Sequence, residues 1–164
     1  SSFGVEIDDA GPVSFSHLSL AKVNGTTQSP SKGSVGVLLG DNQTNSVTIS
    51  NSILSDIAGA CIQGPSAAIE GSTMATHTLF DECEIDPEET GVTLIEPDSG
   101  SPAFKNVTDN DLRLKSTSAA IDAGKPGDDY CEEPKPNGCI VNVGAFGNTD
   151  QAQSSVPDHC LCDD

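Results

Sequence analysis

Residues 13–20 read VSFSHLSL, and residues 47–54 read VTISNSIL. In both segments, apolar and β-branched residues alternate with small polar ones, which is the pattern of a strand with one buried face. A shorter strand-like pattern precedes each of them, GVEI at 4–7 and GVLL at 36–39. The chain therefore repeats a strand, a turn and a second strand, as repeat architectures do.

Later copies of the same patterns follow at uneven intervals. We align ACIQ at 60–63 with GVLL, and AAIEGSTM at 67–74 with VTISNSIL, and weaker copies follow as TLFDECEI at 78–85 and GVTLI at 91–95. No helical periodicity interrupts them, so the chain is predicted to be all-β.

Two all-β architectures fit this pattern, a sandwich and a parallel β-helix. A sandwich needs hairpins, but no two-residue Asn-Gly or Asp-Gly turn joins two long strands here. Short strands that stack on their copies in the next turn favour a right-handed parallel β-helix. The side chains expected to point inward are Val5, Ile7, Phe15, Val37, Leu39, Ile49 and Ile69.

Charge limits the partners of this chain. Its 164 residues, enough for one domain, carry a formal charge of -18 with only seven basic residues. This charge repels nucleic acid and anionic lipid and attracts cations. The sequence has no apolar run near 18 residues, so we expect no membrane insertion.

Six cysteines in an acidic chain indicate an oxidising compartment, and we expect an extracellular, periplasmic or cell-surface location. Zinc is the less favoured reading, because the paired CxxC spacing is missing and the three histidines are scattered. Cys61 aligns with Val37, so it is either a buried thiol or the partner of Cys83 in a disulfide.

The end of the chain carries a more specific pattern. Residues 118–124 read SAAIDAG, residues 133–138 read EPKPNG, and residues 141–149 read VNVGAFGNT. In order and spacing, this region resembles the C-terminal end of secreted bacterial right-handed β-helix repeat proteins, which are relatives of the pectate-lyase-like fold. Ala119 replaces the usual Pro of that family and Phe146 the usual Tyr, both of which are conservative for packing.

The resemblance implies a fold rather than a reaction, because this fold serves lyases, hydrolases, adhesins and surface proteins. We divide the chain into β-helix turns at 1–110, incomplete at the N-terminus, an irregular cap at 111–150 and an acidic, cysteine-containing tail at 151–164. Cys131 and Cys139 bracket a short segment with two prolines, and we expect a disulfide between them to pin the cap over the last turn.

Little in the sequence indicates catalysis. The only basic residue in a strand-like run is Arg113, with Lys115 two positions on. His17 aligns with Asn51, and this alignment favours a turn role for His17 over a catalytic one. We therefore expect no catalytic residue and a non-catalytic extracellular module with a structural, adhesive or glycan- or partner-binding role. The alternative is the C-terminal part of a polysaccharide lyase or glycoside hydrolase whose catalytic turns lie upstream.

Two binding sites are expected. The acidic residues in turns are either solvated turn acids, which is the favoured reading, or ligands of a hard cation. For a Ca²⁺ site, Asp122, Asp128 and Asp129 are the first choice. The strand at 4–7 has no capping element before it, so its edge and the apolar core behind it would lie open. We expect preceding turns of a parent protein, or another protein chain, to cover that edge.

Overall fold

The computed structural model describes residues 3–8, 11–23, 34–40, 46–64, 73–85 and 92–156, and these residues form an all-β structure with three parallel sheets. The first sheet contains β1 (Phe3–Ile7), β4 (Ser34–Leu39) and β7 (Gly59–Gln63). The second contains β2 (Val13–Ser16), β5 (Val47–Ser50), β8 (Thr73–Thr76) and β10 (Val92–Ile95). The third contains β3 (Ser19–Val23), β6 (Ile53–Ile57), β9 (Leu79–Asp81) and β11 (Asp98–Ser99).

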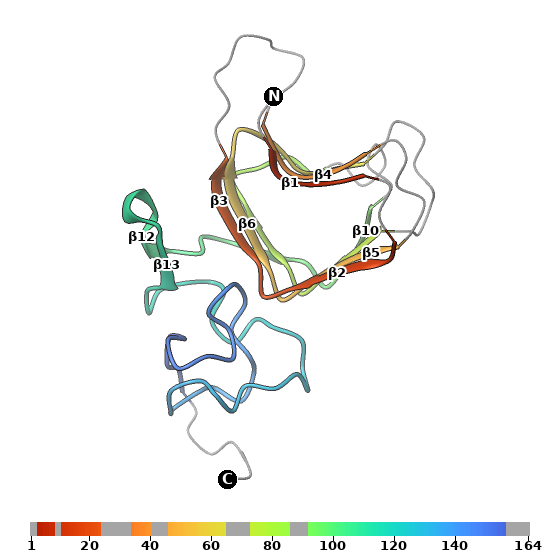
Figure 1. Ribbon diagram of the computed structural model, residues 1–164. Coiled ribbons are helices and arrows are strands. Elements are labelled where there is room, and N and C mark those ends of the chain that lie inside the picture. The colour runs from red at the N-terminus through yellow and green to blue at the C-terminus, as the bar shows by residue number, and fades with distance from the viewer. Residues whose placement is uncertain are drawn as a thin grey trace.

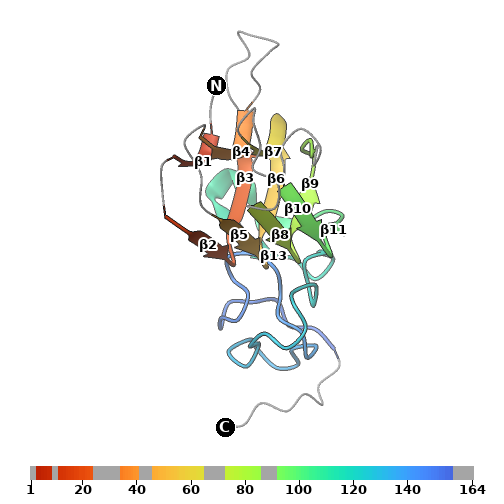
Figure 2. The same ribbon diagram turned by 90° about the vertical axis from the view of Figure 1, so that its right-hand side faces the viewer.

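The chain visits the three sheets in rotation. β1, β2 and β3 each enter a different sheet, and β4, β5 and β6 then pair in parallel with them in the same order. Figure 1 shows the strands of each sheet one behind another, with the three sheets around a common interior, and Figure 2 shows the same stack from the side. Parallel pairs thus stand where a sandwich would have antiparallel hairpins.

The first two repeats pair as the sequence predicts, whereas the third does not. Val13 lies beside Val47 in the register. Val47, however, lies beside Thr73, so the counterpart of VTISNSIL is TMATHTLF at 73–80. The alignment of AAIEGSTM at 67–74 was therefore wrong. Alternation alone allowed both alignments, and the pairing of β6 with β9 fixes the register.

Alternation does predict the inward face of the sheets. Ile7, Val37, Leu39 and Ile49 are buried in one apolar cluster. Val5 and Phe15 pack against that cluster but are only partly buried. The seventh residue expected to point inward, Ile69, lies outside the described residues.

A second apolar cluster lies on the outer side of the third sheet. Ile53 of β6 and Leu79 of β9 point away from the interior and pack with Ala120 and Val143. The same cluster includes Phe104 of β12 (Phe104–Asn106) and Leu114 of β13 (Asp111–Leu114). These two strands pair in antiparallel fashion, and the 3₁₀ helix η1 (Val107–Asp109) lies between them in the sequence. Residues of the third sheet are thus buried on both faces.

Residues 111–156, called here the C-terminal segment, follow β12 and contain little regular structure after β13. Both views show the segment beside the stacked strands, below the bend between β2 and β3. Its contacts reach Ser19, Asn51 and Ile53 in the first two turns. These contacts lie along the side of the turns, where the outward Ile53 and Leu79 need cover. The Ala119 N–H also donates to the Ser101 carbonyl at 3.0 Å, and the cap over the last turn stays a prediction.

The described cysteines are all disulfide-bonded. Cys61 of β7 bonds to Cys83, with Cα atoms 5.3 Å apart, so it is part of a disulfide and not a free buried thiol. The alignment of Cys61 with Val37 was wrong, because Val37 lies beside Ile62 in the register. Closing a loop of this size stabilises a fold by about 2–4 kcal/mol. Cys131 and Cys139 are also bonded, and their predicted bond to each other stays a prediction; Cys160 and Cys162 lie outside the described residues.

Mass mapping of a non-reduced digest tests both pairs. We expect one linked peptide that joins Cys61 to Cys83, because the two residues lie in neighbouring turns at bonding distance. The short spacing of Cys131 and Cys139 predicts a second linked peptide that contains both. Peptides that join either residue to Cys160 or Cys162 would contradict the second pairing and leave the first unaffected.

Candidate functional site

Four polar residues occupy equivalent places where the second sheet bends into the third. His17, Asn51, His77 and Glu96 follow β2, β5, β8 and β10, and their φ angles are 55°, 46°, 44° and 47°. These values lie in the left-handed region, where Asn and His are enriched among residues other than Gly. His17 therefore has the turn position that its alignment with Asn51 predicts. We call these four residues the bend ladder.

The backbone of the bend ladder is bonded from turn to turn. The His17 N–H donates to the Ser50 carbonyl at 3.2 Å, and the Asn51 N–H donates to the Thr76 carbonyl at 3.3 Å. A buried bend needs such partners, since an unpaired backbone amide costs roughly as much as a lost hydrogen bond. Each turn thus supplies a carbonyl that accepts the hydrogen bond from the bend residue of the preceding turn.

Asn51 joins the bend ladder to the C-terminal segment. Its side chain is fully buried; Nδ2 donates to Asp128 Oδ2 at 2.7 Å, and Oδ1 accepts from the Lys125 N–H at 2.9 Å. The Asn51 carbonyl accepts from the Gly144 N–H at 2.8 Å. One residue of the second turn thus makes three hydrogen bonds to the C-terminal segment.

His17 lies half-buried at the same contact. Its Nδ1 lies 3.0 Å from Ser16 Oγ, whereas its Nε2 is buried without a hydrogen-bond partner. A side chain at Gly147 would collide with the His17 ring. Burial lowers the pKa of His17, and the negative charge of Asp128 opposes that effect. The neutral imidazole is therefore the form that this position favours.

The other two residues of the bend ladder, His77 and Glu96, form a second polar cluster. His77 Nε2 lies 2.9 Å from Glu96 Oε2, and His77 Nδ1 lies 2.8 Å from Thr76 Oγ1. Asp98 follows in β11; burial raises its pKa, the neighbouring His77 lowers it, and Glu96 raises it. A histidine bonded to a carboxylate can move a proton, but Glu96 is largely exposed to solvent. We assign no reaction to this pair.

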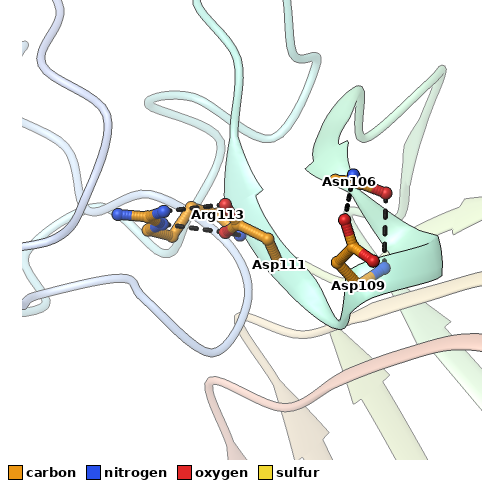
Figure 3. A network of polar contacts seen from close by, with 4 residues as sticks. All are labelled: Asn106, Asp109, Asp111 and Arg113. Atoms are coloured by element: carbon orange, nitrogen blue, oxygen red, sulfur yellow. Dashed lines mark hydrogen bonds and ion pairs between the residues drawn. The ribbon is translucent and has the colours of Figure 1, made fainter.

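Arg113 is bound by its own neighbour in the sequence. Its Nε donates to Asp111 Oδ1 at 2.8 Å and its Nη2 to Asp111 Oδ2 at 2.7 Å, and Figure 3 shows this two-point contact. The hydrogen bonds from Arg113 lower the pKa of Asp111 to about 2. Beside it, Asn106 Oδ1 accepts from the Thr108 and Asp109 amides and caps η1. Arg113 therefore acts as a local ion-pair partner.

The three aspartates of the predicted calcium site each contact a different protein donor. Asp122 Oδ1 accepts from Ser155 Oγ at 2.7 Å, Asp128 bonds to Asn51, and Asp129 Oδ1 accepts from the Cys131 amide at 3.0 Å. Within the described ranges, no three His, Cys, Asp or Glu residues gather where they could hold a metal ion. A calcium site of these three residues stays a prediction.

Glu133 is a buried carboxylate that sequence reasoning missed. Its Oε1 accepts from the Asn142 amide at 2.7 Å and from the Asn148 amide at 3.0 Å. Burial raises the pKa of Glu133, these amides lower it, and the charge of Asp122 raises it further. No local signal separates Glu133 from the exposed Glu132 beside it, because both lie in one acidic loop.

Comparison of this chain with protein-family models, with curated proteins and with solved structures found no match. The function is therefore argued from the geometry of the described residues.

An exchange of charge tests the bond between Asn51 and Asp128. Asn51→Asp should set two carboxylates against each other and lower the free energy of unfolding by about 2 kcal/mol. Amide hydrogen exchange should rise first in the C-terminal segment. The double variant with Asp128→Asn restores a donor opposite the new carboxylate and should recover most of the loss. Equal protection in all three proteins would contradict this role of Asn51.

Acidification should weaken the contact at His17. Because the pKa of His17 is lower in the folded chain, the folded state binds fewer protons than the unfolded state. The stabilisation is complete above the unfolded pKa of about 6.5 and is lost as the pH falls below it. His17→Asn copies the residue of the next turn and does not titrate. Urea unfolding at pH 7.5 and 5.5 should show wild type losing stability relative to this variant, and a constant difference would contradict it.

Proposed function

We propose that the three parallel sheets are turns of a right-handed parallel β-helix, and that the chain acts as a non-catalytic extracellular or cell-surface module. The rotation of strands through the three sheets supports the β-helix. The disulfide between Cys61 and Cys83, together with the bonded Cys131 and Cys139, supports an oxidising location.

The observation that carries this proposal is the difference between the first and second layers of the core. Val5, Val13, Phe15, Leu20 and Val23 of the first turn are only partly buried. The residues paired with them in the second turn are Val37, Val47, Ile49, Leu54 and Ile57, and none is more than 2% exposed. These five positions are thus closed in the second turn and more open in the first, whereas Ile7 of the first turn is as buried as its partner Leu39. We call these five partly buried residues of the first turn the open layer.

A further turn of the same kind would complete this open layer. β1, β2 and β3 each pair with a strand on one side only within the described part of the chain. Unpaired strand edges next to an apolar layer are places where another strand adds. We propose preceding turns of a parent protein as the partner. A second copy is less favoured, because each chain carries a charge of -18.

The contacts of Arg113, His17 and His77 support a non-catalytic role for these three residues. Arg113 is paired with Asp111, His17 lies against the C-terminal segment, and His77 is bonded to Glu96. In a lyase of this fold, the catalytic base would be a basic side chain beside acidic cation ligands. If the parent protein is a polysaccharide lyase or hydrolase, we place its catalytic residues in turns that join at the open layer.

The outer face of the second sheet offers a surface for a neutral partner such as a polysaccharide. Inward and outward residues alternate along its strands, and the outward ones carry hydroxyl or apolar groups and no charge. They are Ser14, Ser16, Thr48, Ser50, Met74, Thr76, Thr93 and Ile95. An uncharged strip on so acidic a chain would allow close approach of an uncharged glycan.

Paired valines test the open layer. Val5→Ser with Val13→Ser should lower the free energy of unfolding only modestly, because both side chains are partly exposed, and should reduce both self-association and binding of an apolar dye. The matched change Val37→Ser with Val47→Ser, one turn further, should cost roughly 3 kcal/mol or more, because these side chains are fully buried. Urea unfolding and sedimentation velocity measure both effects. Equal destabilisation by the two pairs would show that the first layer is already closed.

A further inference from the structure

Glu133 has one satisfied and one unsatisfied carboxylate oxygen. The residue is 3% exposed, and both amide hydrogen bonds, from Asn142 and Asn148, go to Oε1. Oε2 is buried and has no hydrogen-bond partner. A buried carboxylate oxygen without a donor carries a large desolvation cost, so an unsatisfied oxygen of this kind points to a missing positive group.

Asp122 is the acidic neighbour of Glu133, and Asn142 connects the two residues. The Asn142 amide donates to Glu133, and Asn142 Oδ1 accepts from the Asp122 N–H at 2.8 Å. Asp122 itself adopts a left-handed φ of 54°. Its carboxylate lies against the Cα of Gly138, where a side chain would collide with both oxygens. Both residues thus contact Asn142, and the charge of Asp122 acts on Glu133 by raising its pKa.

Among the described residues, no cationic side chain forms an ion pair with either of these two carboxylates. The ion pairs in the described part of the chain join His77 to Glu96 and Arg113 to Asp111. Within the part of the chain that the structure describes, the side-chain donor to Asp122 is the Ser155 hydroxyl, at 2.7 Å. With a chain charge of -18, the surrounding field also favours uptake of a cation.

We propose that Glu133 Oε2 and the Asp122 carboxylate bind a hard divalent cation, for which Ca²⁺ is the probe. Carboxylate oxygens are the ligands that Ca²⁺ prefers. This site keeps Asp122 from the set expected from the sequence and replaces Asp128 and Asp129, which bond to Asn51 and to the Cys131 amide. The proposal does not depend on the role of the open layer.

Tyr130 provides a direct signal for this site. It is the only Tyr in a chain without Trp, and its carbonyl accepts from the Glu133 N–H at 3.1 Å. Titration of the whole chain with Ca²⁺ should change the Tyr130 fluorescence with saturation. At a Ca²⁺ concentration about one hundred times the Kd, the Tm should rise by about 5–10 °C.

Two matched variants separate this site from general attraction of Ca²⁺ to an acidic chain. Glu133→Gln keeps an oxygen for the two amides, so it should fold, and it should lose the fluorescence change and the Tm shift. Glu132→Gln removes the same charge from the exposed neighbour and should keep both responses. The proposal would be overturned if wild type showed neither the fluorescence change nor the Tm shift. Equal responses in wild type and Glu133→Gln would also overturn it.

Discussion

The side chain of Asn51 connects the two parts of this protein. It is fully buried in the bend between two sheets and bonds to Lys125 and Asp128 of the C-terminal segment. A buried amide can be tolerated only where its donor and acceptor groups are both used. Removing the C-terminal segment would leave this side chain unsatisfied, and removing Asn51 would leave Asp128 without its donor. The strands and the C-terminal segment therefore depend on one another.

Packing of the C-terminal segment explains why β6 and β9 of the third sheet carry apolar residues on both faces. In β6, Leu54 points into the interior, whereas the adjacent Ile53 points outward. In β9, Phe80 and Leu79 repeat the arrangement. Strands that are buried on both faces lose the simple alternation of apolar and polar residues. The C-terminal segment covers the outward residues, and Asn51 fixes the place where it does so.

The proposed sites lie in different parts of the molecule and have opposite chemistry. The open layer of the first turn is apolar and suits another turn of protein, whereas the Glu133 site is buried, polar and negative. In the bend ladder, Asn51 bonds to the C-terminal segment and His77 to Glu96. We therefore propose binding at the open layer and at Glu133, and a structural role for the bend ladder.

The all-β class, the inward positions of Ile7, Val37 and Ile49, and the turn position of His17 could be predicted from the amino-acid sequence. These features follow from local alternation and from the similarity of the first two repeats, which short-range patterns can carry. The register of the third repeat, the bond between Cys61 and Cys83, and the position of the C-terminal segment depend on long-range contacts and required the folded structure. The surroundings of Asn51 and Glu133 were also beyond the sequence. Their partners lie 77 and up to 15 residues away, and burial of a polar side chain depends on contacts that no local pattern encodes.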